Sequence, residues 1–322
     1  MGKCLVTKLN GSITNEELRK IGEARIHFAE GSEVSKRYLN LKVSKPVTLE
    51  IHGGYFINKE TSANIGTIIN ITDINRQVET YFSNEKCYIS VSDKYCINVL
   101  RAGNEYDGNL EEINFMTSMK EFFNVSTLIS GDIANARNCK SLINFWIDSC
   151  KNIYGDIAVF ANLPSIKKIT LINADKVYGD ISSLSNIVNN IEVLNINGTS
   201  VHGDFTFLKD SKLTTLNFNN MKGFITGDLS LFGESFLTTN FGNTSNSLSW
   251  SSEIPSSYTV RTCIGGYFEN DLDKYLINIA KCQAINSSNI WDKTIIVSGK
   301  RTSASDAAIT TLQQKGYTVS IS

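Results

Sequence analysis

The chain has 322 residues, of which 41% are hydrophobic and 20% charged, and its formal net charge is −1. This composition is typical of a folded globular protein and excludes a mainly disordered one. A charge so close to zero excludes binding to nucleic acid or to an acidic membrane by bulk electrostatics.

The sequence also limits where the protein is expected to work. Its first twenty residues contain no apolar run long enough for a signal peptide. No stretch approaches the roughly 18 apolar residues that span a bilayer. The seven cysteines include no Cys-x-x-Cys pair, which is typical of free thiols in a reducing compartment. We therefore expect synthesis and assembly in a cytoplasm, without membrane insertion.

Residues 1–104 are predicted to form a β-rich N-terminal domain. Polar and apolar residues alternate there in short stretches separated by turn residues, the pattern of half-buried strands. The predicted strands are 4–9, 23–28, 37–43, 46–57, 66–72, 87–92 and 95–100. A short helix is predicted over 14–22, with Thr14 as N-cap and Glu17 completing a capping box.

A Gly-Asp dipeptide then recurs five times at a constant interval of 24 residues. Its copies begin at Gly131, Gly155, Gly179, Gly203 and Gly227. Gly108 lies 23 residues before the first of them and is predicted to mark a degenerate copy. Because a fixed period of this length indicates stacked repeat units, residues 105–250 are predicted to form a solenoid.

Apolar residues occupy fixed places within each period. In the copy that starts at Gly155 they are Ile157, Phe160, Leu163, Ile166, Ile169, Leu171, Ala174 and Val177. The next copy repeats the pattern with its central part shifted by one residue. This pattern resembles the 24-residue form of the leucine-rich repeat. The Asn of that consensus is absent, and Cys150, Ala174 or Met221 stands at the small inward position instead.

The Gly-Asp pair has a structural interpretation. Gly permits a left-handed turn, and the Asp carboxylate can accept a nearby backbone N–H. Stacking would also bring the carboxylates of successive coils near one another, so a calcium column is an alternative. The Gly-Gly-x-Gly-x-Asp pattern of calcium-binding solenoids is missing, and we predict neither a metal site nor a cofactor.

Residues 251–322 are predicted to form an αβ C-terminal cap. Helical spacing covers 269–282, a strand follows at 293–299, and a second helix spans 302–316. Ser303 is the predicted cap of that helix, with Asp306 at its third position and Gly316 at its end. Residues 317–322 are the final strand. The fold class is therefore α+β, in three parts.

The outward residues of the predicted solenoid strands are the candidate binding site. They form an Asn- and Thr-rich strip with one Trp, a composition that suits a glycan or a flat protein partner. The alternative is a solvated sheet face on which Trp146 packs against a neighbour. The candidate residues are Asn144, Trp146, Asp148, Lys168, Thr170, Ile172, Asn195, Asn197, Thr215, Asn217 and Asn219.

No catalytic motif is present, so no catalytic residue is predicted. The three histidines, His27, His52 and His202, are scattered through the chain. The stretch "HGGYF" at 52–56 is similar to an oxyanion loop of esterases, but no Gly-x-Ser-x-Gly nucleophile motif accompanies it. We expect a protein without enzymatic activity.

A second resemblance covers all three parts of the chain. The opening "CLVTKLNGSI", the Gly-Asp-Ile coils and the closing "GKRTSASDAAITTLQQKGYTVSI" resemble leucine-rich-repeat-like virion proteins of crAss-like bacteriophages that infect Bacteroidetes. This resemblance implies a head or tail fibre protein, located in the virion. Its implied partners are other virion proteins, a host surface glycan or receptor, and further copies of itself in a homo-oligomer. A glycan-binding adhesin and a polysaccharide depolymerase are the alternatives.

Overall fold

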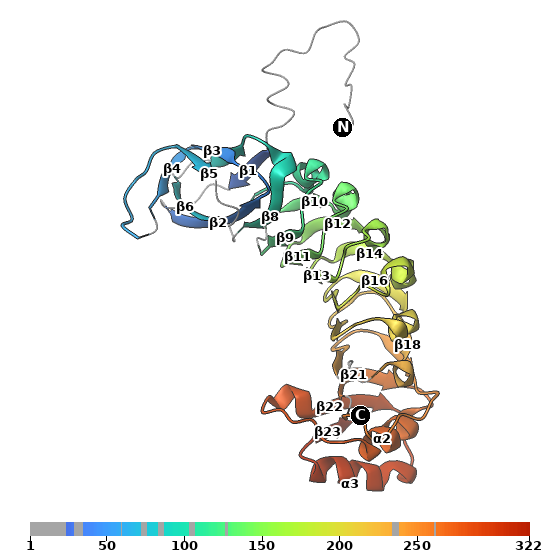
Figure 1. Ribbon diagram of the computed structural model, residues 1–322. Helices are drawn as coiled ribbons and strands as arrows, with labels where there is room; N and C mark the ends of the chain where they lie inside the picture. The colour runs from blue at the N-terminus through green and yellow to red at the C-terminus, as the bar shows by residue number, and fades with distance from the viewer. Residues whose placement is uncertain are drawn as a thin grey trace, which may run out of the picture.

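The computed structural model describes residues 24–28, 35–58, 60–71, 76–82, 87–102, 107–125, 128–233, 238–260 and 262–322. The strand predicted at 4–9 and the helix predicted at 14–22 lie outside these residues. The chain forms a curved solenoid with a β-rich lobe at one end and an αβ unit at the other (Figure 1).

The N-terminal lobe consists of two facing layers of antiparallel strands (Figure 1). One layer has the order β1-β7-β3-β5, with β1 Ala24–Phe28, β3 Val47–His52, β5 Ile68–Ile71 and β7 Cys87–Val91. The other contains β2 Ser35–Val43, β4 Gly54–Ile57, β6 Arg76–Phe82 and, after the short η1 Lys94–Cys96, β8 Ile97–Ala102. The two layers enclose Leu41, Leu49, Phe56 and Ile89, all fully buried.

Two features of this lobe differ from the sequence prediction. The strand predicted over 46–57 is broken at Gly53, whose φ is 85°, so that β3 and β4 enter different layers. Strand β6 was not predicted, although it pairs with both β2 and β4. Its sequence, RQVETYF, has too few apolar residues for a clear period-two pattern.

Each solenoid coil contributes one strand to a long sheet, and these strands run parallel to one another. The strands are β9 Glu121–Asn124, β11 Asn144–Asp148, β13 Lys168–Ile172, β15 Val193–Asn195, β17 Thr215–Asn217 and β19 Thr238–Asn240. Asn144 pairs with Lys168, and Lys168 with Val193, a step that is one residue longer. This extra residue is the shift that the third copy shows in the sequence.

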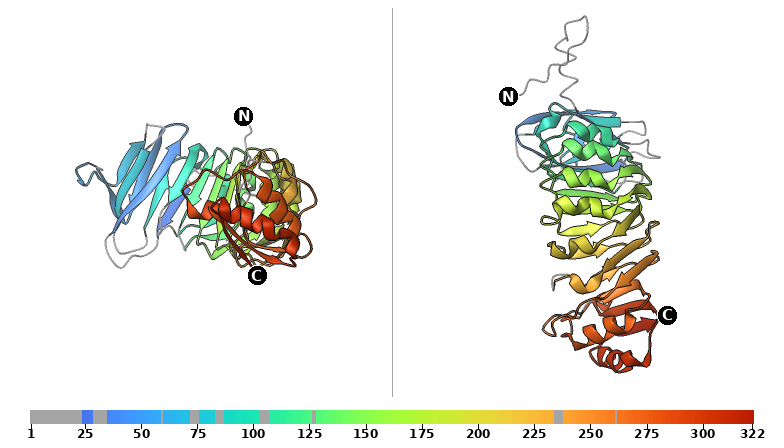
Figure 2. Two further views of the ribbon diagram at one scale, coloured as in Figure 1. Left: turned by 90° about the horizontal axis from the view of Figure 1, so that it is seen from below. Right: turned by 90° about the vertical axis from the view of Figure 1, so that its right-hand side faces the viewer.

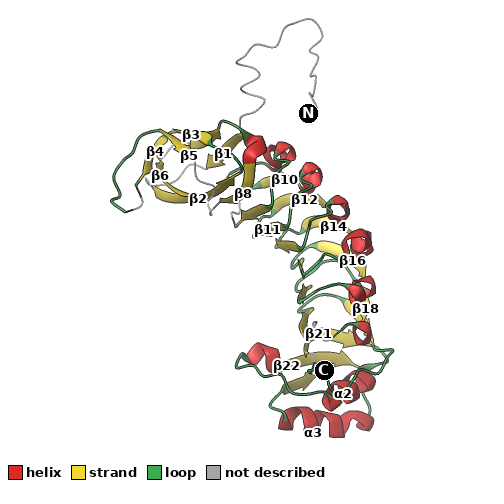
Figure 3. Cartoon of the chain, viewed as in Figure 1, coloured by secondary structure: helices red, strands yellow, loops and turns green. Residues whose placement is uncertain are grey.

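The Gly-Asp dipeptides lie in a second parallel sheet, where each ends a strand or nearly so. Its strands are β10 Ser130–Asp132, β12 Asn152–Asp156, β14 Lys176–Asp180, β16 Ser200–Asp204, β18 Ile225–Asp228 and β20 Asn246–Ser249. A short 3₁₀ helix follows in most coils: η2 Leu110–Phe115, η3 Ile133–Asn138, η4 Ile157–Asn162, η5 Ile181–Ile187, η6 Thr206–Asp210 and η7 Leu229–Leu231. These helices stack along the outer side of the curve, and the long sheet lines its inner side (Figures 2 and 3).

All five aspartates accept a local backbone N–H, as the sequence predicted, and four of them are the N-caps of the helices that follow. Oδ1 of Asp132, Asp156 and Asp180 accepts the N–H of the residue two positions later at 2.8–2.9 Å. Asp204 and Asp228 make the same bond. Asn109 caps η2 in the same way, which confirms that Gly108 marks a degenerate first copy.

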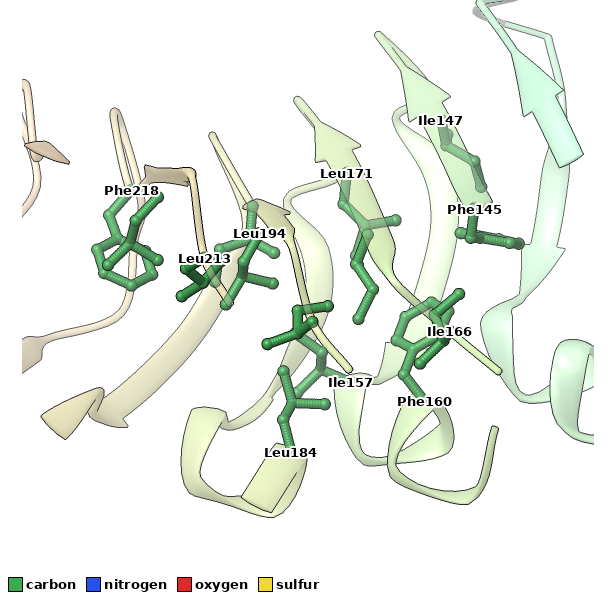
Figure 4. Close-up of a cluster of buried hydrophobic side chains, with 14 of the residues drawn as sticks. Phe145, Ile147, Ile157, Phe160, Ile166, Leu171, Leu184, Leu194, Leu213 and Phe218 are labelled. Atoms are coloured by element: carbon green, nitrogen blue, oxygen red, sulfur yellow. The ribbon is translucent and has the colours of Figure 1, made fainter. Parts of the chain in front are cut away.

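Apolar side chains fill the space between the two sheets and the helices (Figure 4). Phe145, Leu171 and Leu194 enter from the long sheet and meet Phe160 and Leu184 from the outer side. Cys150, Ala174 and Met221 are buried at the small inward position, as predicted. One buried apolar cluster runs without interruption from the N-terminal lobe to the C-terminal unit.

The C-terminal unit continues the long sheet in parallel. Its elements are β21 Thr262–Phe268, α2 Leu272–Lys281, η8 Ile290–Lys293, β22 Thr294–Gly299, η9 Ser303–Ser305, α3 Asp306–Gln314 and β23 Thr318–Ile321. The two predicted helices and the last two predicted strands are present. The prediction of Ser303 as the helix cap is wrong: Thr302 caps η9 by accepting the N–H of Ala304, and η9 leads into α3.

The long sheet crosses both predicted domain boundaries. Its thirteen strands run in the order β23-β22-β21-β19-β17-β15-β13-β11-β9-β8-β2-β6-β4. Strand β8 of the N-terminal lobe pairs with β9, and β19 pairs with β21. The hydrogen-bonded ladder therefore joins all three parts of the chain. Among the described residues, no helix has the length and apolar character required to cross a bilayer.

Candidate functional site

The eleven predicted binding residues lie together on one face of the long sheet. This face lines the inner side of the curve, points away from the apolar core, and is here called the strand face. Its central column consists of Trp146, Thr170, Asn195 and Asn217, which are register partners on successive strands. Asn144, Lys168 and Thr215 form the column on one side. Asp148, Ile172, Asn197 and Asn219 form the third, beyond the strand ends in β15 and β17.

Two residues of the central column are less accessible than the sequence suggested. Thr170 is only 1% exposed, because Trp146 and Asn195 flank it on the neighbouring strands. Trp146 is half-buried, and its ring lies 5.2 Å from that of Phe123. The ring of Trp146 therefore packs against a side chain of the neighbouring strand.

The central column extends beyond the predicted residues at both ends. Phe123 pairs with Trp146, and Arg101 pairs with Phe123 and lies 5.9 Å from the centre of its ring. At the other end, Asn217 pairs with Asn240 and Asn240 with Ile264. Arg101, Phe123 and Ile264 were missed because no regular Gly-Asp copy precedes their strands, and Asn240 because the copy that starts at Gly227 departs from the apolar spacing of the others. A shared T-x-N-F pattern at 215–218 and 238–241 was the available signal.

Asn195 and Asn217 use their side-chain oxygens within the protein. Each Oδ1 accepts the N–H of the residue two positions later, at 3.4 Å for Asn197 and 3.0 Å for Asn219. Such a turn ends each strand and holds the amide in a defined orientation. Asn195 and Asn217 thus form a row of oriented amides in the central column, one per coil. They lie on the outside of the coils and not at the inward position of the leucine-rich-repeat consensus.

Several polar atoms of the strand face are buried and lack a hydrogen-bond partner in the described chain. They are Oδ1 of Asn144, Nε1 of Trp146, Oδ1 of Asn197 and Oδ1 of Asn240. An unpaired buried polar atom costs about 1–3 kcal/mol. Because these atoms are shielded from solvent, a partner could pair them only if the side chains around them moved.

A hollow of about 380 Å³ lies where the strand face meets the C-terminal unit. It is lined by Thr214, Thr215, Leu216, Asn217, Asn240, Ile264 and Asp292. Asp292 belongs to η8 and its Oδ2 accepts a hydrogen bond of 2.6 Å from Ser287. Nothing in the sequence indicated that η8 would approach β17, because the two are more than 70 residues apart.

Charged groups at the margin of the strand face are paired with one another. Lys167 and Glu192 are 2.8 Å apart, and this hydrogen bond holds the pKa of Glu192 below its ordinary value. Arg101 and Glu121 form a second pair. The strand face itself offers two charged side chains, Lys168 and Asp148, among its amide, hydroxyl and aromatic groups.

Among the residues that the structure describes, no three His, Cys, Asp or Glu side chains are placed to hold a metal ion. The "HGGYF" stretch starts at the end of β3, and His52 stacks on Tyr88 with ring centres 4.3 Å apart. His27 lies in β1 and His202 in β16. The histidines thus lie on separate strands.

These coils define a solenoid of the leucine-rich-repeat type. No family model and no curated protein matches the chain. Among solved structures, internalin C2 from Listeria monocytogenes is similar at 19% identity and a TM-score of 0.32, covering 50% of this chain and 80% of that one.

Two plant structures are also similar. The leucine-rich-repeat ectodomain of the receptor kinase GASSHO1/SCHENGEN3 from Arabidopsis thaliana, solved with CASPARIAN STRIP INTEGRITY FACTOR 2, matches at 15% identity and a TM-score of 0.38. PEPR1-AtPEP1 matches at 16% and 0.37. The alignments cover 66% and 63% of this chain, but only 28% and 32% of the plant chains.

Proposed function

We propose that this protein is a non-enzymatic binding module that presents its strand face to a protein partner. The observation that carries this proposal is the central column, an unbroken row of aromatic, hydroxyl and amide side chains from Phe123 to Asn240. Amides both donate and accept hydrogen bonds, so such a row suits the main chain of a protein partner.

The area of the strand face limits how much of a partner it can contact. Four strands about 4.8 Å apart and five residues of about 3.3 Å each cover about 300 Å². A stable complex usually buries about 800 Å² on each partner. A partner must therefore also reach past the four central strands, and the hollow beside Asp292 offers the adjoining contact surface.

The finer proposal concerns where the partner is found. The sequence resemblance to crAss-like phage proteins supports a structural or adhesive component of a virion, working as a homo-oligomer in a head or tail fibre. Its partner is then another virion protein or a receptor on the host surface. Mass spectrometry of purified particles tests this directly, and absence of the chain from intact particles would exclude it.

Site-specific photo-crosslinking tests the binding surface. A photoreactive amino acid at Asn217, beside the hollow, is compared with one at Lys209, exposed on η6 at the outer side of the same coil. Particles assembled with each variant are irradiated and digested. We expect one defined adduct from Asn217 and none from Lys209. Equal adducts from both positions, or none from Asn217, would contradict the proposal.

A further inference from the structure

A row of exposed rings runs along the second sheet, on a surface distinct from the strand face. Tyr154 and Tyr178 are 48% and 54% exposed, and His202 takes the equivalent place in the next coil. Phe224, which is 52% exposed, follows just before β18. Large exposed rings that recur in successive coils indicate an interaction surface rather than isolated surface residues.

Three of these rings lie beside a carboxylate of the preceding coil. Asp132 is the register partner of Tyr154, Asp156 of Tyr178 and Asp180 of His202. The Oδ1 atoms of Asp132 and Asp156 cap η3 and η4. Their Oδ2 atoms make no hydrogen bond or ion pair within the part of the chain that the structure describes, and remain available as acceptors.

A shallow hollow of about 370 Å³ lies beside two of these carboxylates and the side chain of Tyr178. Its lining includes Asp132, Arg137, Asp156, Val159 and Tyr178. Nε of Arg137 donates to the carbonyl of Ala134 at 2.9 Å, which orients the guanidinium without neutralising it. This volume is within the range of small-molecule sites, about 300–1,000 Å³.

The charges around the rings select the class of ligand. Asp132 and Asp156 disfavour an anion, whereas Arg137 in the hollow and Lys176, the other register partner of Tyr154, disfavour a cation. Neither set of charges disfavours a neutral ligand with an apolar face and many hydroxyl groups. A ring can cover its apolar face, while carboxylates accept and Arg donates hydrogen bonds at its edge.

We propose that this ring row binds a neutral oligosaccharide, with Tyr154, Tyr178, Asp156 and Arg137 as the main contacts. The two Tyr side chains are one strand apart and displaced by two residues, about 8 Å in strand geometry. A linear chain of several sugar units therefore contacts both rings at once. This site is independent of the partner proposed for the strand face.

A glycan array of neutral hexose and N-acetylhexosamine oligosaccharides tests the proposal, with oligogalacturonate and oligolysine as charged comparators. We expect binding to a subset of the neutral probes only. The double variant Tyr154→Ala/Tyr178→Ala should lose about tenfold or more in affinity at an unchanged melting temperature. Tyr267→Ala removes a ring exposed to 39% in β21 and should bind as the parent does.

Two further variants separate ligand binding at the ring row from helix capping by Asp156. Asp156→Asn keeps a capping oxygen, as Asn109 does in the first coil, but replaces the free acceptor by a donor. It should weaken binding without lowering stability, while Tyr178→Phe should retain binding through the ring. Absence of binding to every neutral probe, equal binding to either charged comparator, or undiminished binding by the double variant would overturn the proposal. A substitution at Asn217 alters the strand face and leaves the ring row unchanged. Loss of the protein partner is therefore distinguished from loss of glycan binding.

Discussion

A β-carbon at Gly179 would collide with Oδ1 of Asp156, which lies one coil earlier in the chain. That oxygen is held in place because it accepts the N–H of Ala158 at 2.9 Å. Gly155 stands in the same relation to Asp132, and Gly203 to Asp180. In the Gly-Asp dipeptide, the Asp therefore caps the helix of its own coil, and the Gly leaves room for the Asp of the coil before it.

Gly179→Ala should consequently destabilise the solenoid for two separable reasons. Gly179 has a φ of 116°, and the new methyl group would overlap Asp156. Gly66→Ala is the matched control, because its φ is 98° and a β-carbon there meets no atom within 4 Å. We expect the Gly179 variant to lose about 1–3 kcal/mol more than the control, measured by urea unfolding. Equal losses would show that backbone conformation alone explains the glycine.

The capping carboxylate of Asp180 should make the solenoid sensitive to acid. Hydrogen bonds from Ser182, aided by the nearby His202, hold the pKa of Asp180 below its ordinary value of 3.8. A lowered folded-state pKa stabilises the protein above pH 4 or so, and this contribution disappears as the pH falls through the folded-state pKa. Asp180→Asn keeps a capping oxygen but does not titrate. Its stability should therefore fall less than the parent's between pH 6 and pH 3, and parallel losses would contradict this origin.

Leu171→Asp should unfold the coils around it. Leu171 is fully buried between the two sheets, and an unpaired carboxylate there would cost several kcal/mol. Ile172→Asp places the same charge on the next residue of β13, which faces outward and is half-buried. Circular dichroism melting should show a large loss for the first variant and a small one for the second. Similar melting curves for both would mean that the inward assignment of Leu171 is wrong.

Trp146→Ala should reduce both partner binding and stability. Its ring packs 5.2 Å from that of Phe123 and is half-buried, so we expect a loss of about 1–2 kcal/mol in unfolding free energy. Trp146→Phe retains a ring against Phe123 and should restore most of the stability. If Trp146→Ala melts with the parent, the contact with Phe123 contributes no stability and the side chain serves binding alone.

The buried thiols should be inert until the protein unfolds. Burial raises the pKa of Cys139, Cys150 and Cys263 to about 12, so very little thiolate exists at pH 8. Alkylation by iodoacetamide should be about a thousandfold slower than for an unfolded thiol, whose pKa is about 8.5. Mass spectrometry of digested protein before and after addition of urea measures this. Modification of Cys263 in the native protein would contradict its burial.

Much of the fold could be predicted because its determinants are local or periodic. The hydrogen bond from a backbone N–H to each repeat Asp joins residues two positions apart, and the inward set from Ile157 to Val177 follows from spacing within one coil. The same reasoning placed the predicted strand-face residues on one side. It could not show that Thr170 is buried or that Trp146 packs on Phe123, because both depend on the side chains of neighbouring coils.

The sequence by itself determined the period, the capping turns and the inward side chains, since each depends on short-range sterics and hydrogen bonds that repeat with the chain. Only the tertiary structure decided which residues of different coils are neighbours. Lateral pairing in the two sheets placed Tyr178 next to Asp156 and Asn217 next to Asn240, and the path of the C-terminal unit brought Asp292 to the strand face. These contacts arise from register between distant segments, which hydrogen-bond geometry sets only once the coils are stacked.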